Sequence, residues 1–230
     1  MRFSGAARLG ILALIVIVLI VVAYHELEVK LKGNIHNIIS KVSVFGKQEI
    51  PAAKAKVVRN KCNLSVLCAS GHLAFRLLSG AASIVGPKIC LEDDILMSSV
   101  KNNVGRGFNI ALVEGSTGMV KDTKVIDMWG GDVKDLITFL KDIPKGMLVF
   151  IATFDDGATK LNDEARELIQ QLGSKAIKSL AFRDSWVFVG AKGIDSSLFE
   201  KHMKNNKETN KYEGWPELVE IEGCIPTTKV

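Results

Sequence analysis

Four cysteines carry the clearest chemical signal in this chain of 230 residues. They are Cys62, Cys68, Cys90 and Cys224. All of them follow an apolar run at residues 9–23, and Arg2 and Arg8 precede that run. A cationic flank before a short apolar run is typical of a secretion signal. An even number of cysteines behind such a signal predicts two disulfides, so we expect the protein to work outside the cytosol.

Two further segments combine tryptophan with charged side chains. One contains Asp127 and Trp129, and the other contains Arg183 and Trp186. A tryptophan face beside carboxylate and guanidinium groups suits a sugar, whose ring stacks on the indole while its hydroxyls form paired hydrogen bonds. The alternative is structural, because tryptophan is normally largely buried and buried charges are normally paired. The first interpretation predicts one ligand site formed by all four residues.

Residues for catalysis or metal binding do not form a recognisable pattern. The four histidines lack metal-ligand spacing, and bridged cysteines would leave no thiolate nucleophile. The sequence contains neither a GxSxG elbow nor a phosphate-binding loop. The acid pairs Asp93/Asp94 and Asp155/Asp156 are expected to be solvated, since turns favour aspartate for backbone reasons. We therefore predict no enzyme, no metal site and no cofactor, and expect a binding or signalling protein.

The elements that must position these residues alternate irregularly along the chain. Apolar alternation predicts strands near residues 73–77, 108–112, 121–128, 146–154, 180–191 and 218–221. Asp132 and Asn162 are expected to cap two amphipathic helices, and Ser196 to start a short third one. The segment 105–107 is expected to be a turn before a strand. Many strands with two strong helices in the middle predict an α+β fold.

Charge is distributed unevenly between the start of the chain and the rest. Residues 1–61 contain ten Lys/Arg and three Asp/Glu, whereas residues 62–230 contain twenty and twenty-two. The basic character thus belongs to a leader and linker, and a nucleic-acid partner is not expected. We predict a signal peptide or anchor at 1–23, a variable linker at 24–61 and one globular domain at 62–230.

The leader and a nearby sequon leave two alternatives open. Fifteen apolar residues are short for a membrane span of about 20. Val21 and Ala23 offer a cleavage site before Tyr24, after which no stable membrane insertion is expected. The sequon Asn63-Leu64-Ser65 lies between two cysteines in a short loop, so glycosylation of Asn63 is possible but access is restricted.

Four stretches resemble one family of secreted, cytokine-like proteins, which includes the interleukin-like epithelial–mesenchymal transition inducer. The stretches are residues 79–113, 154–174, 182–193 and 210–226. The resemblance is collinear from about Cys62 to the end of the chain and does not cover residues 24–61. It implies a compact β-β-α globule of two antiparallel sheets with flanking helices. It also implies the disulfides Cys62–Cys90 and Cys68–Cys224.

The resemblance also implies a function. It indicates a non-catalytic signalling protein, secreted through the endoplasmic reticulum and Golgi, that acts on a cell-surface receptor. The same domain type occurs in the stem of a glycosyltransferase, so the alternative is a lectin-like module that binds a glycan at the four Asp, Trp and Arg residues above. A Golgi-anchored enzyme or accessory protein is a third possibility. Some relatives carry an unpaired, cross-linking cysteine at the position of Val189, so covalent dimers by that route are not expected here.

Overall fold

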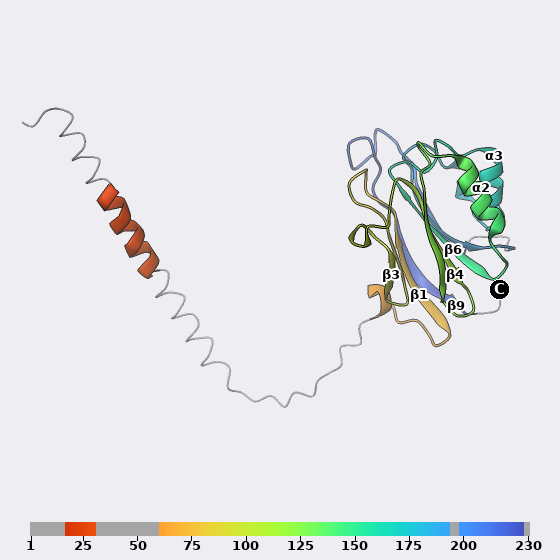
Figure 1. The fold of residues 1–230 in the computed structure, drawn as a ribbon, viewed down its shortest axis with the longest axis horizontal. Helices are drawn as coiled ribbons and strands as arrows, with labels where there is room; N and C mark the ends of the chain where they lie inside the picture. Colours follow the sequence, from red (N-terminus) through yellow and green to blue (C-terminus); the bar gives the residue numbers. More distant parts are fainter. Residues whose placement is uncertain (1–16, 31–59, 194–197, 228–230) are drawn as a thin grey trace, which may run out of the picture. The chain divides into compact units, whose positions relative to one another are not determined.

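The computed structural model describes residues 17–30, 60–193 and 198–227 (Figure 1). The chain divides into two units, Met1–Val57 and Val58–Val230. In the first unit, residues 17–30 form a helix that runs across the predicted cleavage point. No helix in the described ranges is both long and apolar enough to span a membrane. The start of the predicted leader and residues 31–59 of the predicted linker lie outside the described residues.

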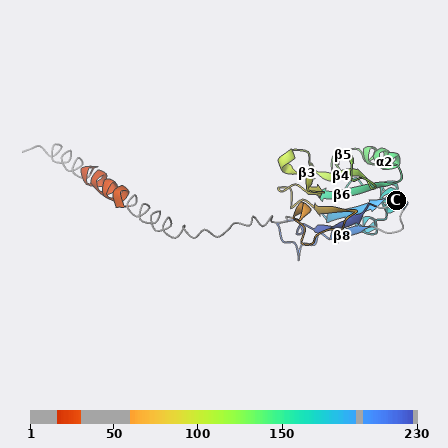
Figure 2. The ribbon, with the colours of Figure 1, turned by 90° about the horizontal axis from the view of Figure 1, so that it is seen from below.

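The second unit is built on two antiparallel sheets, which can be followed in two views (Figures 1 and 2). One sheet has the strand order β3-β2-β1-β9 and the other the order β5-β4-β6-β7-β8. The first contains β1 (His72–Leu78), β2 (Lys88–Leu91), β3 (Asp94–Met97) and β9 (Glu220–Pro226). The second contains β4 (Gly107–Glu114), β5 (Val120–Ile126), β6 (Met147–Phe154), β7 (Ser185–Ala191) and β8 (Phe199–Met203).

Two helices lie side by side on the outer face of the five-stranded sheet (Figure 1). Helix α2 (Val133–Asp142) begins after Asp132, whose carboxylate accepts a hydrogen bond from the Lys134 N–H at 2.9 Å. Helix α3 (Asp163–Gln170) begins after Asn162, which accepts one from the Ala165 N–H at 2.9 Å. Three short 3₁₀ helices complete the unit: η1 (Lys61–Asn63), η2 (Ser99–Lys101) and η3 (Ala176–Ser179). The predicted α+β fold is confirmed.

Apolar side chains fill two layers, because the central strands are buried on both faces. The layer between the sheets includes Phe75, Leu77, Ala111, Phe150 and Val187. The layer between the five-stranded sheet and the helices includes Phe108, Ile151, Leu136, Ile169, Trp186 and Phe188. Strands such as β6 and β7 therefore have no polar face.

The predicted third helix at Ser196 is wrong. Residues 199–203 form β8, an edge strand in which Glu200 lies opposite Phe188 of β7. Phe199 and Met203 pack against the layer between the sheets. A spacing of four residues fits one face of a helix and equally one face of a strand, so the apolar pattern alone did not decide between them.

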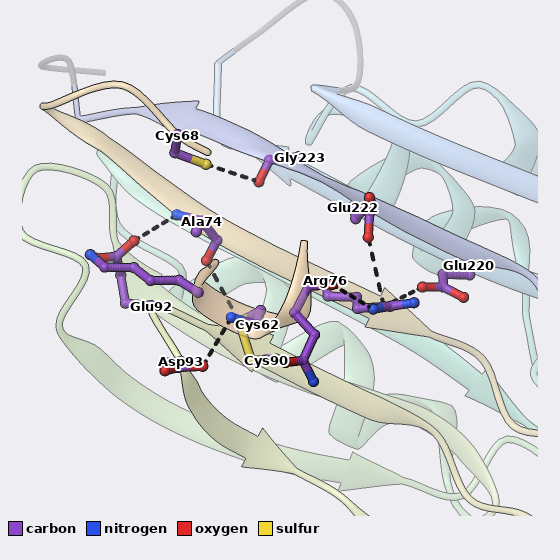
Figure 3. Close-up of a disulfide and its surroundings, with 12 residues drawn as sticks. Cys62, Cys68, Ala74, Arg76, Cys90, Glu92, Asp93, Glu220, Glu222 and Gly223 are labelled. Atoms are coloured by element: carbon purple, nitrogen blue, oxygen red, sulfur yellow. Dashed lines mark hydrogen bonds and ion pairs between the residues drawn. A yellow bond between two sulfur atoms is a disulfide. The ribbon is translucent and has the colours of Figure 1, made fainter. Parts of the chain in front are cut away.

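Two disulfides anchor the four-stranded sheet, and Figure 3 shows the one between Cys62 and Cys90. Cys62 is bonded to Cys90 and Cys68 to Cys224, across sequence separations of 28 and 156 residues. These are the pairs that the family resemblance implies. Arg76 of β1 also forms ion pairs with Glu220 and Glu222 of β9. Strand β9 is thus held to the sheet by a backbone ladder, by ion pairs and by a covalent bond.

Candidate functional site

Trp186 is a core residue of β7. Its side chain has no exposed surface, and its ring stacks on Phe188 and packs against Phe108 at centroid distances of 5.4 and 5.6 Å. The indole Nε1 donates a hydrogen bond to the Glu200 carboxylate at 2.9 Å. The prediction that Trp186 lines a ligand site is wrong, because a fully buried ring offers no face to a ligand. For this residue the structural interpretation applies.

Asp127 pairs with Arg106 and not with Arg183. Arg106 donates two hydrogen bonds to the Asp127 carboxylate, at 3.0 and 2.7 Å, and the backbone N–H groups of Trp129 and Gly130 donate two more, at 2.9 and 3.1 Å. The Asp127 side chain is 37% exposed. Asp127 is therefore not one half of a buried Asp–Arg pair, which is what the structural alternative requires of it.

The start of β4 must approach Asp127 closely for this pairing. Gly107 has a φ of +99°, and a Cβ atom there would lie 2.1 Å from the Ile126 carbonyl oxygen. Only glycine fits such a position without displacing the backbone. Gly107 therefore lets the neighbouring Arg106 reach the carboxylate from the end of the adjacent strand.

Arg183 belongs to an aromatic contact of its own. It occupies a left-handed turn (φ 60°) before β7, and its guanidinium lies over Trp215 at 3.8 Å and over Phe182 at 4.8 Å from the ring centroids. Asp155 accepts a hydrogen bond from the Trp215 Nε1 at 3.1 Å, and its Oδ1 lies 3.9 Å from the Arg183 Nε. Cation–π contacts with the two rings and an ion pair with Asp155 therefore hold the Arg183 guanidinium in place.

Trp129 links the Arg106–Asp127 pair to the aromatic cluster around Arg183. It is 47% exposed, and its ring lies 5.7 Å from that of Phe182, which is 41% exposed. Arg106, Asp127 and Asp155 line one cavity of about 370 Å³. We call the combined set the Arg–Trp site. It consists of Arg106, Asp127, Trp129, Asp155, Phe182, Arg183 and Trp215.

Asp156 differs from the solvated turn residue predicted from the sequence. It is 1% exposed, and its Oδ1 accepts a hydrogen bond from the Ala158 N–H at 2.9 Å. In the described part of the chain, the Asp156 Oδ2 and the Arg183 Nε are buried without a hydrogen-bond partner. Such atoms are uncommon in folded proteins, and these two flank Asp155. Asp93 and Asp94 are exposed as predicted.

Asp184, 3% exposed, fixes the turn that carries Phe182 and Arg183. Its carboxylate accepts hydrogen bonds from the Ala181 N–H at 2.9 Å and the Asn205 N–H at 2.7 Å, and lies 2.6 Å from the His202 Nε2. The Asn205 side chain in turn donates to the Phe182 carbonyl at 3.0 Å. One buried carboxylate thus joins the turn to β8 and to the loop that leads to Trp215.

Four members of the site were missed in the sequence: Arg106, Asp155, Phe182 and Trp215. Trp215 had the clearest signal, since it was the one tryptophan not assigned to a role. Arg106 lies between two glycines, a pattern that indicated a turn but no partner. Asp155 was grouped with Asp156 as solvated, although the two differ in burial.

The hydrogen bonds to Asp127 should lower the pKa of its carboxyl group. Its hydrogen bonds, first from Arg106 and then from Gly130 and Trp129, hold the pKa of Asp127 well below its ordinary value. We expect the carboxylate to stay ionised across the range near pH 4 where aspartates usually titrate, as followed by carboxyl NMR shifts. Its contribution to stability is then present above that range and lost only as the pH falls through the lower, folded-state pKa. Arg106→Gln should return the pKa toward the ordinary value, and an unchanged titration would contradict the pairing.

Fold and site together define an α+β domain of two antiparallel sheets, one of which carries two disulfides. Its described residues contain no cluster of metal-binding side chains. A family model described as interleukin-like EMT inducer matches residues 106–194, a range that holds every member of the Arg–Trp site except Trp215.

The relatives are close along almost the whole chain. The chain is 54% identical to human protein FAM3C and 53% identical to that of Danio rerio, with 98% of each chain covered in both cases. It is 58% identical to protein FAM3A of Mus musculus, with 77% of this chain and 78% of that protein covered. The chain therefore belongs to the FAM3 family of cytokine-like proteins.

Proposed function

We propose that this chain is a secreted, non-catalytic signalling protein that acts on a cell-surface receptor through the Arg–Trp site. One observation carries the proposal: Trp129 and Phe182 are half-exposed and touch each other beside two arginines. Protein interfaces draw most of their binding energy from a few clustered tryptophan, tyrosine and arginine side chains. Membership of a cytokine-like family supports this use of the site.

The geometry supports a binding role for the acidic residues of the site. Asp127 is bonded to Arg106, and Asp155 is bonded to Trp215 and lies near Arg183. The lowered pKa of Asp127 makes that carboxylate a poor proton donor or acceptor near neutral pH. These acids orient the arginines and the tryptophan, which the partner would contact.

Saturable binding to intact cells tests the receptor proposal. The secreted full chain, labelled at its C terminus, is incubated with cells before and after mild protease treatment or glycosidase treatment of the surface. Binding that saturates and is lost only after protease treatment supports a protein receptor. Binding that does not saturate, or that survives protease treatment unchanged, contradicts it.

A glycan is the second candidate partner, and a specific observation favours it. Trp129 is half-exposed and its backbone N–H bonds to Asp127, which lines a cavity together with Arg106 and Asp155, so an aromatic face lies near donors and acceptors for hydroxyls. A glycan array probed with the secreted protein tests this function. A specific signal that Trp129→Ala and Arg106→Gln both remove supports it, and a flat array contradicts it.

The leader should be removed on secretion. We expect protein from the medium of expressing cells to begin at Tyr24, because Val21 and Ala23 supply small residues before that position. N-terminal sequencing checks this, and protein found only in membrane pellets with Met1–Tyr24 intact would contradict it.

The same preparation tests the proposed glycan on Asn63, which is exposed in η1. A mass unchanged by a glycosidase that removes N-linked glycans would exclude that modification.

A further inference from the structure

A second cavity is separate from the Arg–Trp site. It has a volume of about 700 Å³ and lies where the end of α3, the start of η3 and the end of β7 meet. Its polar lining consists of Lys175, Lys178, Lys192, Gln170, Gln171 and Ser174. Among the described residues, the charged side chains that line it are lysines, and the folded domain as a whole carries twenty basic and twenty-two acidic residues.

These lysines are not neutralised by neighbours. Elsewhere the structure pairs Lys61, Lys121, Lys141 and Lys211 with glutamates. Within the described ranges, none of the three cavity lysines forms an ion pair. The Lys192 ammonium is fixed by two backbone carbonyls at the end of α2, those of Lys141 and Ile143, at 3.2 and 2.8 Å. These bonds hold the cation in place without cancelling its charge.

The Glu200 carboxylate stabilises the cavity wall. It accepts hydrogen bonds from the Ser174 hydroxyl, from the N–H groups of Lys175 and Ala176 at 3.0 and 3.2 Å, and from the Trp186 indole at 2.9 Å. Four uncharged donors therefore use its two oxygens. These bonds fix the turn that carries Lys175 and Lys178, and both lysines are exposed.

We propose that this cavity binds a sulfated polysaccharide. Lysine ammoniums are compact cations that bind sulfate and phosphate oxygens as point charges, and the two glutamine amides add neutral donors. In the described part of the chain no aromatic ring lines the cavity, so these residues offer no stacking face of the kind that a neutral sugar would need. Its volume lies in the range of small-molecule sites and admits more than one anionic group of a chain.

A membrane surface carries the same kind of anion but fits the cavity less well. Membrane-binding surfaces add large apolar side chains that enter the acyl boundary, and none of the described residues that line this cavity is of that kind. The choice of an extracellular polysaccharide rests on the secretion proposed above. Because the cavity shares no residue with the Arg–Trp site, a bound polysaccharide would retain the protein at the cell surface while leaving the receptor contact open.

Binding to immobilised heparin tests the proposal, with the full chain purified from medium. We expect the wild type to bind, and K175A/K178A to lose about tenfold or more in affinity, since each lysine near an anionic surface contributes roughly fivefold. The matched control is K88A/K101A, which removes two exposed lysines from β2 and η2, away from the cavity, and should change affinity by less than about twofold. Lys192 is left intact because it supports the end of α2. Unchanged tryptophan fluorescence shows that each variant is folded.

Several results would overturn the proposal. The first is an absence of heparin binding by the wild type. The second is an equal loss of heparin affinity in both double variants. The third is binding to phosphatidylserine vesicles without any binding to heparin. The last result would assign the cavity to a membrane. None of them touches the receptor proposal, which is measured on cells with the wild type. Absence of the chain from the medium would remove the secretion on which the choice of ligand rests.

Discussion

Replacing Trp186 with alanine should lower the free energy of unfolding by roughly 3–5 kcal/mol, the cost of deleting a large buried aromatic side chain. The ring is fully buried and packs against two phenylalanines, and its indole supplies one of the donors to Glu200. A domain with a total stability of about 5–15 kcal/mol would lose a large part of it. Urea unfolding followed by far-ultraviolet circular dichroism measures the change.

Trp129→Ala is the matched control for this prediction. Trp129 is 47% exposed, so the same substitution should cost less than about 1 kcal/mol. Trp186→Phe keeps most of the buried volume and removes the Nε1 donor, so its effect should fall between the two. Equal effects of Trp186→Ala and Trp129→Ala would contradict the assignment of one ring to the core and the other to the surface.

The second large effect is expected from the disulfide that holds β9. Opening Cys68–Cys224 with the double change to serine frees a loop of 156 residues, and the chain-entropy model gives roughly 4–5 kcal/mol for such a closure. Opening Cys62–Cys90 frees only 28 residues and should cost less, roughly 3–4 kcal/mol. Denaturant unfolding of both double variants under non-reducing conditions measures the difference.

Peptide mapping without reduction checks the pairing itself. The peptide that contains Cys62 should be joined to that of Cys90, and the peptide that contains Cys68 to that of Cys224. A Cys62–Cys68 link would show that the pairing is wrong. A larger loss of stability from opening the shorter loop would show that strain or local packing, and not loop length, governs these bonds.

The sequence predicts the helices well because each has two independent signals. Asp132 and Asn162 supply the capping side chains, and the apolar spacing behind them supplies the buried face. Strand β7 is less predictable at its start. The apolar run suggests a strand from residue 180, but Asp184 ties residues 181–184 into a turn and the strand begins at Ser185. That turn depends on contacts with β8 and the following loop, which local sequence does not encode.

The candidate site is predictable only in part for a related reason. Asp127, Trp129 and Arg183 lie in the exposed cluster that we call the Arg–Trp site, whereas Trp186 lies in the core, and a ligand role for the three stays a prediction. Every residue of β7 is buried, so alternation there has no polar face to distinguish an outward ring from an inward one. The partners Arg106 and Trp215 come from distant segments, and their contacts follow from sheet register and loop packing.

Cell-surface binding by variants of the Arg–Trp site tests the central claim most directly. The variant W129A/F182A removes the two half-exposed rings, and L67A/M119A removes two exposed apolar side chains from loops elsewhere. If the Arg–Trp site contacts the receptor, the first variant should lose at least about tenfold in affinity for intact cells, as expected for clustered interface aromatics. The second should bind as the wild type does. Equal binding by both variants, with both folded, would contradict the assignment of receptor binding to this site.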